Sequence, residues 1–289
     1  MQFGFALPNI FTSITNPATL RTSAILAEDI GFASIWVADH TLEPVDNAHR
    51  LVQSEALLTL AYVAGVTQRV TLGTSVLVFP ARSPLLAAKQ IATLQHLFGR
   101  TVIVGAGAGW CEKEFGFLGV DFKRRGRLFD EYIDILRKLW TQPSPTHQGA
   151  YTFSDVIFTP KLDVPPQIWV GGRSESAVRR AAQRGDGYQP SVSDSDPATA
   201  AEVINRFSLA KQLRSATPER PFTLSLWLCV HTQQGASAVI DQISAYVAAG
   251  VEYPVIFFAH ESNEEGEESK ELLQSLETFG REVLPAFAR

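Results

Sequence analysis

The chain has 289 residues, of which 45% are hydrophobic and 19% are charged, so it can bury a large core and is neither disordered nor fibrous. Its 25 Lys and Arg residues against 30 Asp and Glu residues give a formal net charge of −5, which argues against a nucleic-acid partner. The two cysteines, Cys111 and Cys229, are too few for a disulfide framework and lack the paired spacing of a zinc site. Without a signal sequence or 18 consecutive apolar residues, we expect a cytoplasmic protein with no membrane partner.

Short apolar runs alternate with amphipathic stretches along the chain. The runs are apolar nearly throughout, as is typical of strands buried on both faces of a parallel sheet. They lie at 2–7, 34–37, 70–78, 101–104, 167–170, 187–189, 222–230 and 253–258. The helical patterns lie near 20–30, 54–64, 84–97, 125–140, 174–184, 197–213, 236–249 and 269–283.

The spacing of the strands predicts the fold. Strand starts recur at roughly the 30-residue length of a βαβ unit, and eight such units close a barrel. We therefore expect an α/β protein, a single (β/α)8 TIM barrel that spans residues 1–289.

Two segments depart from the regular alternation. The interval between the fourth and fifth strands is long and rich in proline, so we expect an insertion there, a loop at about 143–166 in which 151–153 and 156–158 form a short hairpin. The Glu-rich stretch 261–271 is interpreted as a solvated surface loop rather than a binding tail.

A barrel of this type places its chemistry at the carboxyl ends of its strands. That rim contains segments 7–9, 39–40, 75–80, 105–110, 171–174 and 188–189, together with His231 and His260. Asp39 and His40 follow the second strand directly. An imidazole is suited to proton transfer near neutral pH, and Asp39 can orient it, although a histidine in a loop is often structural. His231 and His260 are weaker candidates because each ends its strand without a matching acid.

Two glycine-rich segments lie on the same rim. Segment 104–110 follows a strand, but its third glycine comes too early for a dinucleotide fingerprint, so we interpret it as backbone that lies close to a flat ligand. Gly171, Gly172, Arg173 and Ser174 join a strand to a helix start, where backbone N–H groups attract an anion such as a cofactor phosphate. An ordinary βα turn with Ser174 as the helix cap explains this segment equally well.

Other enzyme classes lack their usual signals. The sequence has no G-x-S-x-G, H-E-x-x-H or G-x-x-x-x-G-K-[ST] motif, and we expect no metal site. A Schiff-base aldolase would need a lysine on a strand, and none of the predicted strands contains one.

In this order, the motifs resemble the luciferase-like monooxygenase superfamily of flavin- and deazaflavin (F420)-dependent oxidoreductases. The resemblance runs from the first residues to about Pro190, and the last third of the chain matches only in architecture. The matching segments are 31–40, 69–78, 88–94, 105–110, 114–115, 125–127, 130–132, 165–172 and 185–188.

The resemblance implies a (β/α)8 barrel with a flavin or deazaflavin ring across its mouth. It implies a cis peptide bond between Ser75 and Val76, in a bulge of the third strand that supports the ring. The other residues that it implies are Gly105, Ala106 and Gly107 near the ring, Gly171, Gly172, Arg173 and Ser174 at the cofactor phosphate, and Asp39 and His40 in the catalytic pocket.

The same resemblance favours coenzyme F420 as the cofactor, with hydride transfer to or from a small organic substrate and proton transfer by His40. The alternatives are an FMN-dependent monooxygenase of the same superfamily and a non-catalytic protein that binds or stores a flavin. Sugar-phosphate dehydrogenases of the group carry a Glu where this chain has Trp110, which argues against glucose 6-phosphate as substrate. The resemblance also implies a homodimer formed through helices near strands two and three.

Overall fold

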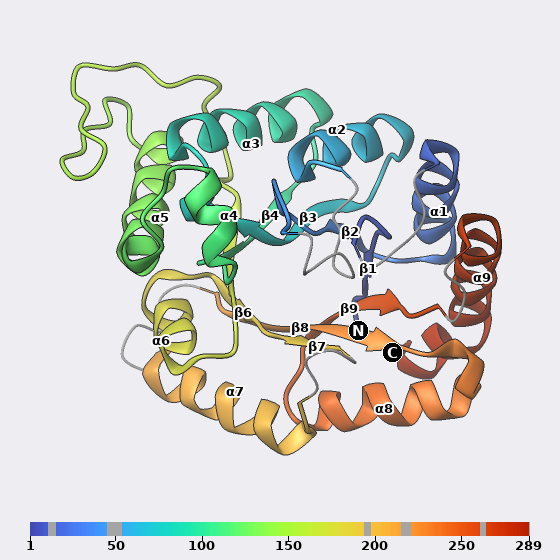
Figure 1. Ribbon diagram of the computed structural model, residues 1–289. Helices are drawn as coiled ribbons and strands as arrows, with labels where there is room; N and C mark the ends of the chain where they lie inside the picture. Colours follow the sequence, from blue (N-terminus) through green and yellow to red (C-terminus); the bar gives the residue numbers. More distant parts are fainter. Residues whose placement is uncertain (11–15, 45–53, 194–197, 215–220, 261–263, 289) are drawn as a thin grey trace.

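The computed structural model describes residues 1–10, 16–44, 54–193, 198–214, 221–260 and 264–288 (Figure 1). Eight parallel strands close into a ring, because neighbouring strands pair in chain order and the last pairs with the first. They are β1 (Gly4–Ala6), β2 (Ser34–Val37), β3 (Thr71–Val78), β4 (Val102–Gly107), β5 (Gln167–Gly171), β6 (Gly187–Gln189), β8 (Thr223–Val230) and β9 (Tyr253–Phe258). The predicted TIM barrel is confirmed.

A ninth, two-residue strand, β7 (Ser191–Val192), follows β6. Both β6 and β7 pair with β8, β6 at Thr223 and Leu224 and β7 further along at Trp227 and Leu228. The strand boundaries differ from the predicted ones mainly in β4, which extends to Gly107 because Gly105 and Gly107 still pair with the neighbouring strands.

Helices surround the barrel in the alternation that the sequence predicts (Figure 1). Their buried positions recur at helical spacing; in α5 the buried face includes Leu128, Tyr132, Ile135 and Leu139. The helices are α1 (Pro17–Ile30), α2 (Ala56–Val66), α3 (Pro84–Phe98), α4 (Glu112–Phe117), α5 (Arg125–Thr141), α6 (Glu175–Arg184), α7 (Ala200–Arg214), α8 (Ala236–Ala248) and α9 (Glu265–Thr278). The predicted start of the sixth helical pattern, Pro197, lies outside the described residues.

The expected loop at 261–271 is wrong over most of its length, because α9 begins at Glu265. Residues 261–263 lie outside the described residues. Within the helix, Glu268, Leu272 and Leu276 are buried at helical spacing, so an amphipathic face decides the structure there.

The segment between α5 and β5 contains neither a helix nor a strand, as an inserted loop should. The predicted hairpin between 151–153 and 156–158 is wrong. Instead, His147 and Phe153 form a single antiparallel bridge, with N–H to O distances of 2.9 and 3.0 Å. Phe158 is 8% exposed and packs in the core, so burial of its ring replaces pairing with the first segment.

Carboxylates anchor the amino-terminal ends of the strands. Glu28 accepts hydrogen bonds of 2.6–3.0 Å from the N–H groups of residues 68–70, just before β3. Asp186 accepts one of 3.0 Å from the N–H of Ile168 in β5, and Glu252 accepts one of 3.0 Å at the start of β8. These contacts fix the register at the end of the barrel away from the loops that follow the strands. No helix in the described ranges is long and apolar enough to span a bilayer.

Candidate active site

A cavity of about 770 Å³ opens at the carboxyl ends of the strands, within the size range of small-molecule and cofactor sites. Nine of the eleven site residues that the sequence predicts line it: Asp39, His40, Ser75, Val76, Gly107, Gly171, Gly172, Arg173 and Ser174. The loops after β2, β3, β4 and β5 therefore converge on one space, as the barrel geometry requires.

Gly105 and Ala106 do not line this cavity. A Cβ on Gly105 would collide with the carbonyl oxygen of Thr74, so this glycine permits close packing of β3 on β4. Ala106 is fully buried in the hydrophobic core. Of the three predicted residues Gly105, Ala106 and Gly107, only Gly107 has surface that faces the cavity.

The peptide bond between Ser75 and Val76 is cis, and the pairing of β3 with β4 shifts register between Thr74 and Leu77. The bulge that the resemblance implies is thus present. The Val76 side chain lies between two glycines: a Cβ on Gly107 would come within 2.6 Å of one methyl group and a Cβ on Gly171 within 2.5 Å of the other. Any side chain at either glycine would displace Val76 from the cavity wall.

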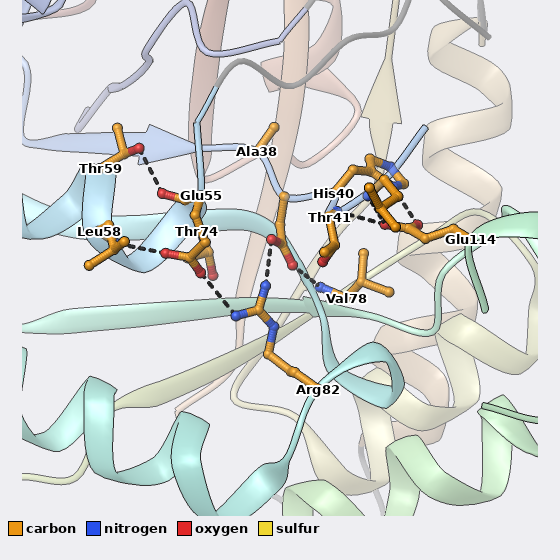
Figure 2. A network of polar contacts seen from close by, with 12 residues as sticks. Ala38, His40, Thr41, Glu55, Leu58, Thr59, Thr74, Val78, Arg82 and Glu114 are labelled. Carbon is orange, nitrogen blue, oxygen red and sulfur yellow. Dashed lines mark hydrogen bonds and ion pairs between the residues drawn. The ribbon is translucent and has the colours of Figure 1, made fainter. Parts of the chain in front are cut away.

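His40 is held by Glu114 of α4 and not by Asp39, so the predicted pairing with Asp39 is wrong. The Nδ1 atom of His40 lies 2.8 Å from Oε2 of Glu114, whose other oxygen accepts the N–H of Thr41 at 2.7 Å (Figure 2). Trp110 donates its indole N–H to Nε2 of His40 at 3.2 Å. The imidazole therefore has a partner on each of its nitrogens.

Charge and burial have opposite effects on the pKa values of His40 and Glu114. Burial alone would lower the pKa of His40, but the hydrogen bond and charge of Glu114, with smaller contributions from Glu43 and Asp39, raise it above its ordinary 6.5. Burial alone would raise the pKa of Glu114, but the bonds from His40 and from two backbone N–H groups hold it below its ordinary value. Glu114 is thus a fixed carboxylate beside a histidine that can take up a proton.

Asp39 has a different partner, Arg82, which follows β3. The Arg82 guanidinium lies 2.6 Å from Oδ1 of Asp39 and 3.0 Å from Oε1 of Glu55, and Figure 2 shows the contact with Glu55. The N–H of Val78 donates to Oδ2 of Asp39 at 2.8 Å. Burial raises the pKa of Asp39, and Arg82 and Val78 offset this only in part. Asp39 therefore ties the loop after β2 to the end of β3, on the wall of the cavity.

The cavity has a cationic end at the start of α6. Ser174 caps this helix, accepting the N–H of Ala177 at 3.2 Å, and its hydroxyl lies 2.9 Å from that of Ser176. Gly172 turns the chain into the helix with a φ of 106°. Arg173 and three further cations, Lys123, Arg125 and Arg180, also line the cavity. Helix dipole, hydroxyl groups and cations together fit an anionic ligand group.

A polar group without a partner lies on the same cavity. The Ser225 hydroxyl donates to the Tyr253 carbonyl at 2.7 Å, so it accepts the Gln189 side-chain N–H at 3.0 Å. The Gln189 Oε1 atom is left buried with no hydrogen-bond partner among the described residues. Since such an acceptor costs free energy when unpaired, it fits a ligand with an N–H donor.

His231 and His260 do not line the cavity. Burial lowers the pKa of His260, and Glu271 lies 4.0 Å from its Nδ1. Both cysteines are buried and neither forms a disulfide bond. No cluster of three or more metal-binding side chains occurs in the parts of the chain that the structure describes.

The sequence analysis did not assign a role in the site to four residues that the structure places there: Glu114, Arg82, Gln189 and Trp110. Glu114 and Trp110 stood inside motifs quoted for the resemblance, but nothing in the spacing linked Glu114 to a histidine 74 positions earlier. Gln189 stood among the rim residues, without a signal that marked it as an acceptor.

The fold and the site together define a TIM-barrel protein with a cavity at the carboxyl ends of its strands, lined by His40 and by cationic side chains. The chain belongs to the luciferase-like monooxygenase family, whose model matches residues 1–283.

Similar proteins support this membership. Over 176 residues, 60% of this chain and 52% of that protein, it is 35% identical to the F420-dependent glucose-6-phosphate dehydrogenase of Beutenbergia cavernae. The solved structure of the monooxygenase RslO1 from Streptomyces bottropensis covers all of both chains with a TM-score of 0.78 at 21% identity. An F420-dependent secondary alcohol dehydrogenase, solved with an F420-acetone adduct, covers 100% of this chain and 99% of that one with a TM-score of 0.79 at 17% identity. At such identities the two structures establish the shared fold.

Proposed function

We propose that the protein is an oxidoreductase that binds coenzyme F420 and transfers a hydride to or from a small organic substrate. The observation that carries the proposal is the cavity itself, which is lined by His40, paired with Glu114, after β2 and by four cations. Arg173 precedes α6, Lys123 and Arg125 lie just before and at the start of α5, and Arg180 lies within α6, where it pairs with Asp130 at 2.6 Å. One phosphate of FMN needs fewer cations than this, whereas the F420 tail adds carboxylates to its phosphate. The F420-dependent proteins among the relatives support the same cofactor.

The residues present fit such a cofactor at both of its ends. The Gln189 Oε1 acceptor suits the imide N–H that both a flavin and a deazaflavin ring carry. Gly107 and Gly171 leave room at the bulge, with Val76 between them as an apolar support. Arg173, with the Ser174 hydroxyl, would hold the phosphate at the helix N-terminus.

Side chains of this protein would position the substrate and move a proton. A bound deazaflavin supplies or accepts the hydride, and the protein supplies position and electrostatics. His40 takes or gives the accompanying proton at Nε2, while Glu114 fixes the ring through Nδ1. Asp39 and Arg82 hold the wall around them and do not touch His40 through a hydrogen bond.

Calorimetric titration of the purified protein with F420 and with FMN tests the cofactor. We expect F420 to bind and FMN to bind at least tenfold more weakly. Arg173→Gln should weaken F420 binding, and Arg179→Gln, which alters an exposed residue of the same helix, should not. Tight FMN binding with no F420 binding would instead make the protein an FMN-dependent monooxygenase.

Turnover distinguishes an enzyme from a protein that only binds or stores a flavin. With bound reduced cofactor, we expect a substrate-dependent reoxidation that His40→Ala slows at least about tenfold. If no substrate panel reoxidises the cofactor, the protein is a binding or storage protein. An unchanged rate in His40→Ala would remove this residue from the mechanism.

We further propose that the protein acts in the cytoplasm as a homodimer formed through α2 and α3. Leu58 and Tyr62 on α2 and Leu86 on α3 are large apolar residues that are 70%, 40% and 57% exposed, and association would cover them. Light scattering of the wild type and of Leu58→Asp checks this. A monomeric wild type at micromolar concentration would contradict it.

A further inference from the structure

Tyr188 of β6 reaches the turn that begins α6. Its side chain is fully buried, and its ring packs edge to face on that of Phe207 with centroids 5.9 Å apart. Tyr188 pairs with Val170 of β5, so its side chain lies on the same face of the sheet as that of Val170, two residues before Gly172. The hydroxyl donates to the carbonyl oxygen of Gly172 at 3.0 Å. A side chain that does not line the cavity therefore holds a backbone group on its rim.

This hydrogen bond fixes the orientation of one peptide group. The bond between Gly172 and Arg173 is trans, so its carbonyl and its N–H point in opposite directions. Because the Gly172 oxygen is turned outward to Tyr188, the N–H of Arg173 is turned inward, toward the cavity that Arg173 lines. The positive side of this peptide dipole therefore faces the cationic end of the cavity.

Glycine at position 172 makes the reverse orientation accessible. Gly172 has a φ of 106°, and glycine adopts positive and negative φ about equally readily, so its backbone alone does not select one orientation. A reversed peptide would turn the carbonyl oxygen toward the cavity. That oxygen would repel the anionic group that the helix dipole and the cations attract.

The Tyr188 hydroxyl remains a donor at every pH at which the protein is folded. Burial raises the pKa of Tyr188 above its ordinary 10, and the nearby cations Arg206 and Arg173 offset this only in part. A phenol that keeps its proton can always donate to the Gly172 carbonyl. The packing of Tyr188, and not its titration, therefore sets the orientation of the peptide.

We propose that Tyr188 is a positioning residue for the cofactor phosphate: its hydroxyl holds the Gly172 carbonyl out of the cavity, so that the turn before α6 presents N–H groups to the phosphate. This inference rests on the proposed function, which places a cofactor phosphate at this turn. It does not depend on which cofactor binds, because F420 and FMN both carry a phosphate group. Tyr188 does not line the cavity and acts through Gly172.

The first experiment measures the binding of inorganic phosphate to the full-length protein labelled with 15N-serine. Titration should shift the amide signals of Ser174 and Ser176, which line the cavity at the start of α6. Tyr188→Phe keeps the ring and removes the hydroxyl, so it should weaken phosphate binding at these two signals about fivefold or more. Equal affinities in Tyr188→Phe and the wild type, or no shift of the two signals in the wild type, would overturn the inference.

Tyr246→Phe is the matched control. The Tyr246 hydroxyl donates to the carbonyl oxygen of Ala198 at 2.7 Å, and neither residue lines the cavity. Loss of this buried hydrogen bond should lower Tm about as much as Tyr188→Phe does, and it should leave the phosphate affinity unchanged. If Tyr246→Phe weakens phosphate binding equally, general destabilisation explains both results and the inference is wrong.

The second experiment observes the turn itself. Labelling with 13C-carbonyl glycine and 15N-arginine gives one signal for the peptide between Gly172 and Arg173, and others only for the pairs 99–100, 126–127 and 280–281. Tyr188→Phe should move the Gly172 carbonyl signal to a lower 13C shift, the direction expected when a carbonyl loses a hydrogen bond. The other three signals should stay in place. An unmoved Gly172 signal would overturn the inference.

The third experiment tests whether Tyr188 acts through Gly172. In Gly172→Ala, a Cβ would lie 3.2 Å from that of Ala177 at a φ that strains any side chain, so the turn must change and phosphate binding should weaken. Adding Tyr188→Phe to this variant should then weaken phosphate binding no further. Losses that multiply would show that the hydroxyl acts elsewhere and would overturn the inference. Failure of F420 to bind to a protein that binds phosphate would overturn the proposed function alone.

Discussion

Replacement of Glu114 by glutamine removes one charge from the site with almost no change of shape. The Glu114 side chain is 1% exposed and accepts hydrogen bonds from His40 at 2.8 Å and from the N–H groups of Thr41 and Leu42 at 2.7 and 3.3 Å. The glutamine oxygen can keep the two backbone bonds, but its NH2 group then faces Nδ1. His40 would have to carry its proton on Nε2, where Trp110 already donates.

The expected decrease in stability follows from the loss of the charged hydrogen bond between Glu114 and His40. A hydrogen bond to a charged group contributes about 1.5–3 kcal/mol, so Glu114→Gln should lower the free energy of unfolding by about 2 kcal/mol. For a protein of this size, that corresponds to a fall in Tm of roughly 4–8 °C. Turnover should fall about 100-fold or more, because the proton-transfer nitrogen is in the wrong form.

The pKa shifts of Glu114 and His40 determine at which pH the loss of stability in Glu114→Gln is largest. Glu114 has a lowered pKa in the folded protein, so its contribution is present above its ordinary value of 4.5 and is lost as pH falls through the folded pKa. His40 has a raised pKa, so its contribution is complete below its ordinary 6.5 and is lost as pH rises through the folded pKa. The stability difference between wild type and Glu114→Gln should therefore be largest between about pH 4.5 and 6.5.

Thermal unfolding followed by circular dichroism between pH 4 and 9 measures this difference. Glu112→Gln is the matched control, since Glu112 lies on the same helix and is exposed. If Glu114→Gln unfolds like Glu112→Gln at every pH, the ion pair contributes nothing and the reasoning is refuted.

Three further substitutions test other parts of the structure. Gly171→Ala should weaken cofactor binding about tenfold or more in a fluorescence titration, because its Cβ would lie 2.5 Å from Val76. Arg82→Gln should cost about 3 kcal/mol in urea unfolding by leaving the Asp39 carboxylate buried without its ion-pair partner, and the cost should shrink at low pH because burial already raises the pKa of Asp39. Glu28→Gln should cost about 2 kcal/mol at neutral pH, through weaker bonds to three N–H groups. Because these N–H groups outweigh burial and hold the pKa of Glu28 below 4.5, that cost should fall as pH drops through the folded pKa.

Two of these variants, Gly171→Ala and Glu28→Gln, have a neutral control. Gly116→Ala adds a methyl group to an open site, so it should leave cofactor binding unchanged. Asp29→Asn changes the exposed neighbour of Glu28 and should alter stability by less than about 0.5 kcal/mol. Controls that behave like the test variants would show that the named contacts are not the cause.

The barrel could be predicted from the sequence because its strands are short runs buried on both faces. Segment 253–258 is apolar along its whole length, and every one of its residues is buried. The ends of β4 and α9 were less predictable, because glycine is unfavourable in a strand and a run of glutamates is typical of a solvated surface segment. Gly105 and Gly107 extend β4 because β3 packs too closely for a side chain there, and Glu265 starts a helix because Leu272 needs a buried face.

The candidate site could be located from the sequence, but its internal pairing could not. The rule that parallel strands end at one rim places His40 and Arg173 on the same cavity without any distance information. Which acid holds His40 depends on a six-residue helix, α4, whose glycine and short length give little helical signal. Adjacency in sequence favoured Asp39, whereas the fold gives Asp39 to Arg82 and brings in Glu114.

The carboxylates at the amino-terminal ends of the strands have a consequence for how this protein can change. Glu28, Asp186 and Glu252 secure the barrel at the end opposite to the cavity, so much of the polar contribution to folding is separated in space from the loops that carry the chemistry. Loop residues such as Trp110 can then be randomised in laboratory evolution with little penalty in folding yield. Diversity introduced around Glu28 would instead reduce the soluble fraction of the library without producing new specificities.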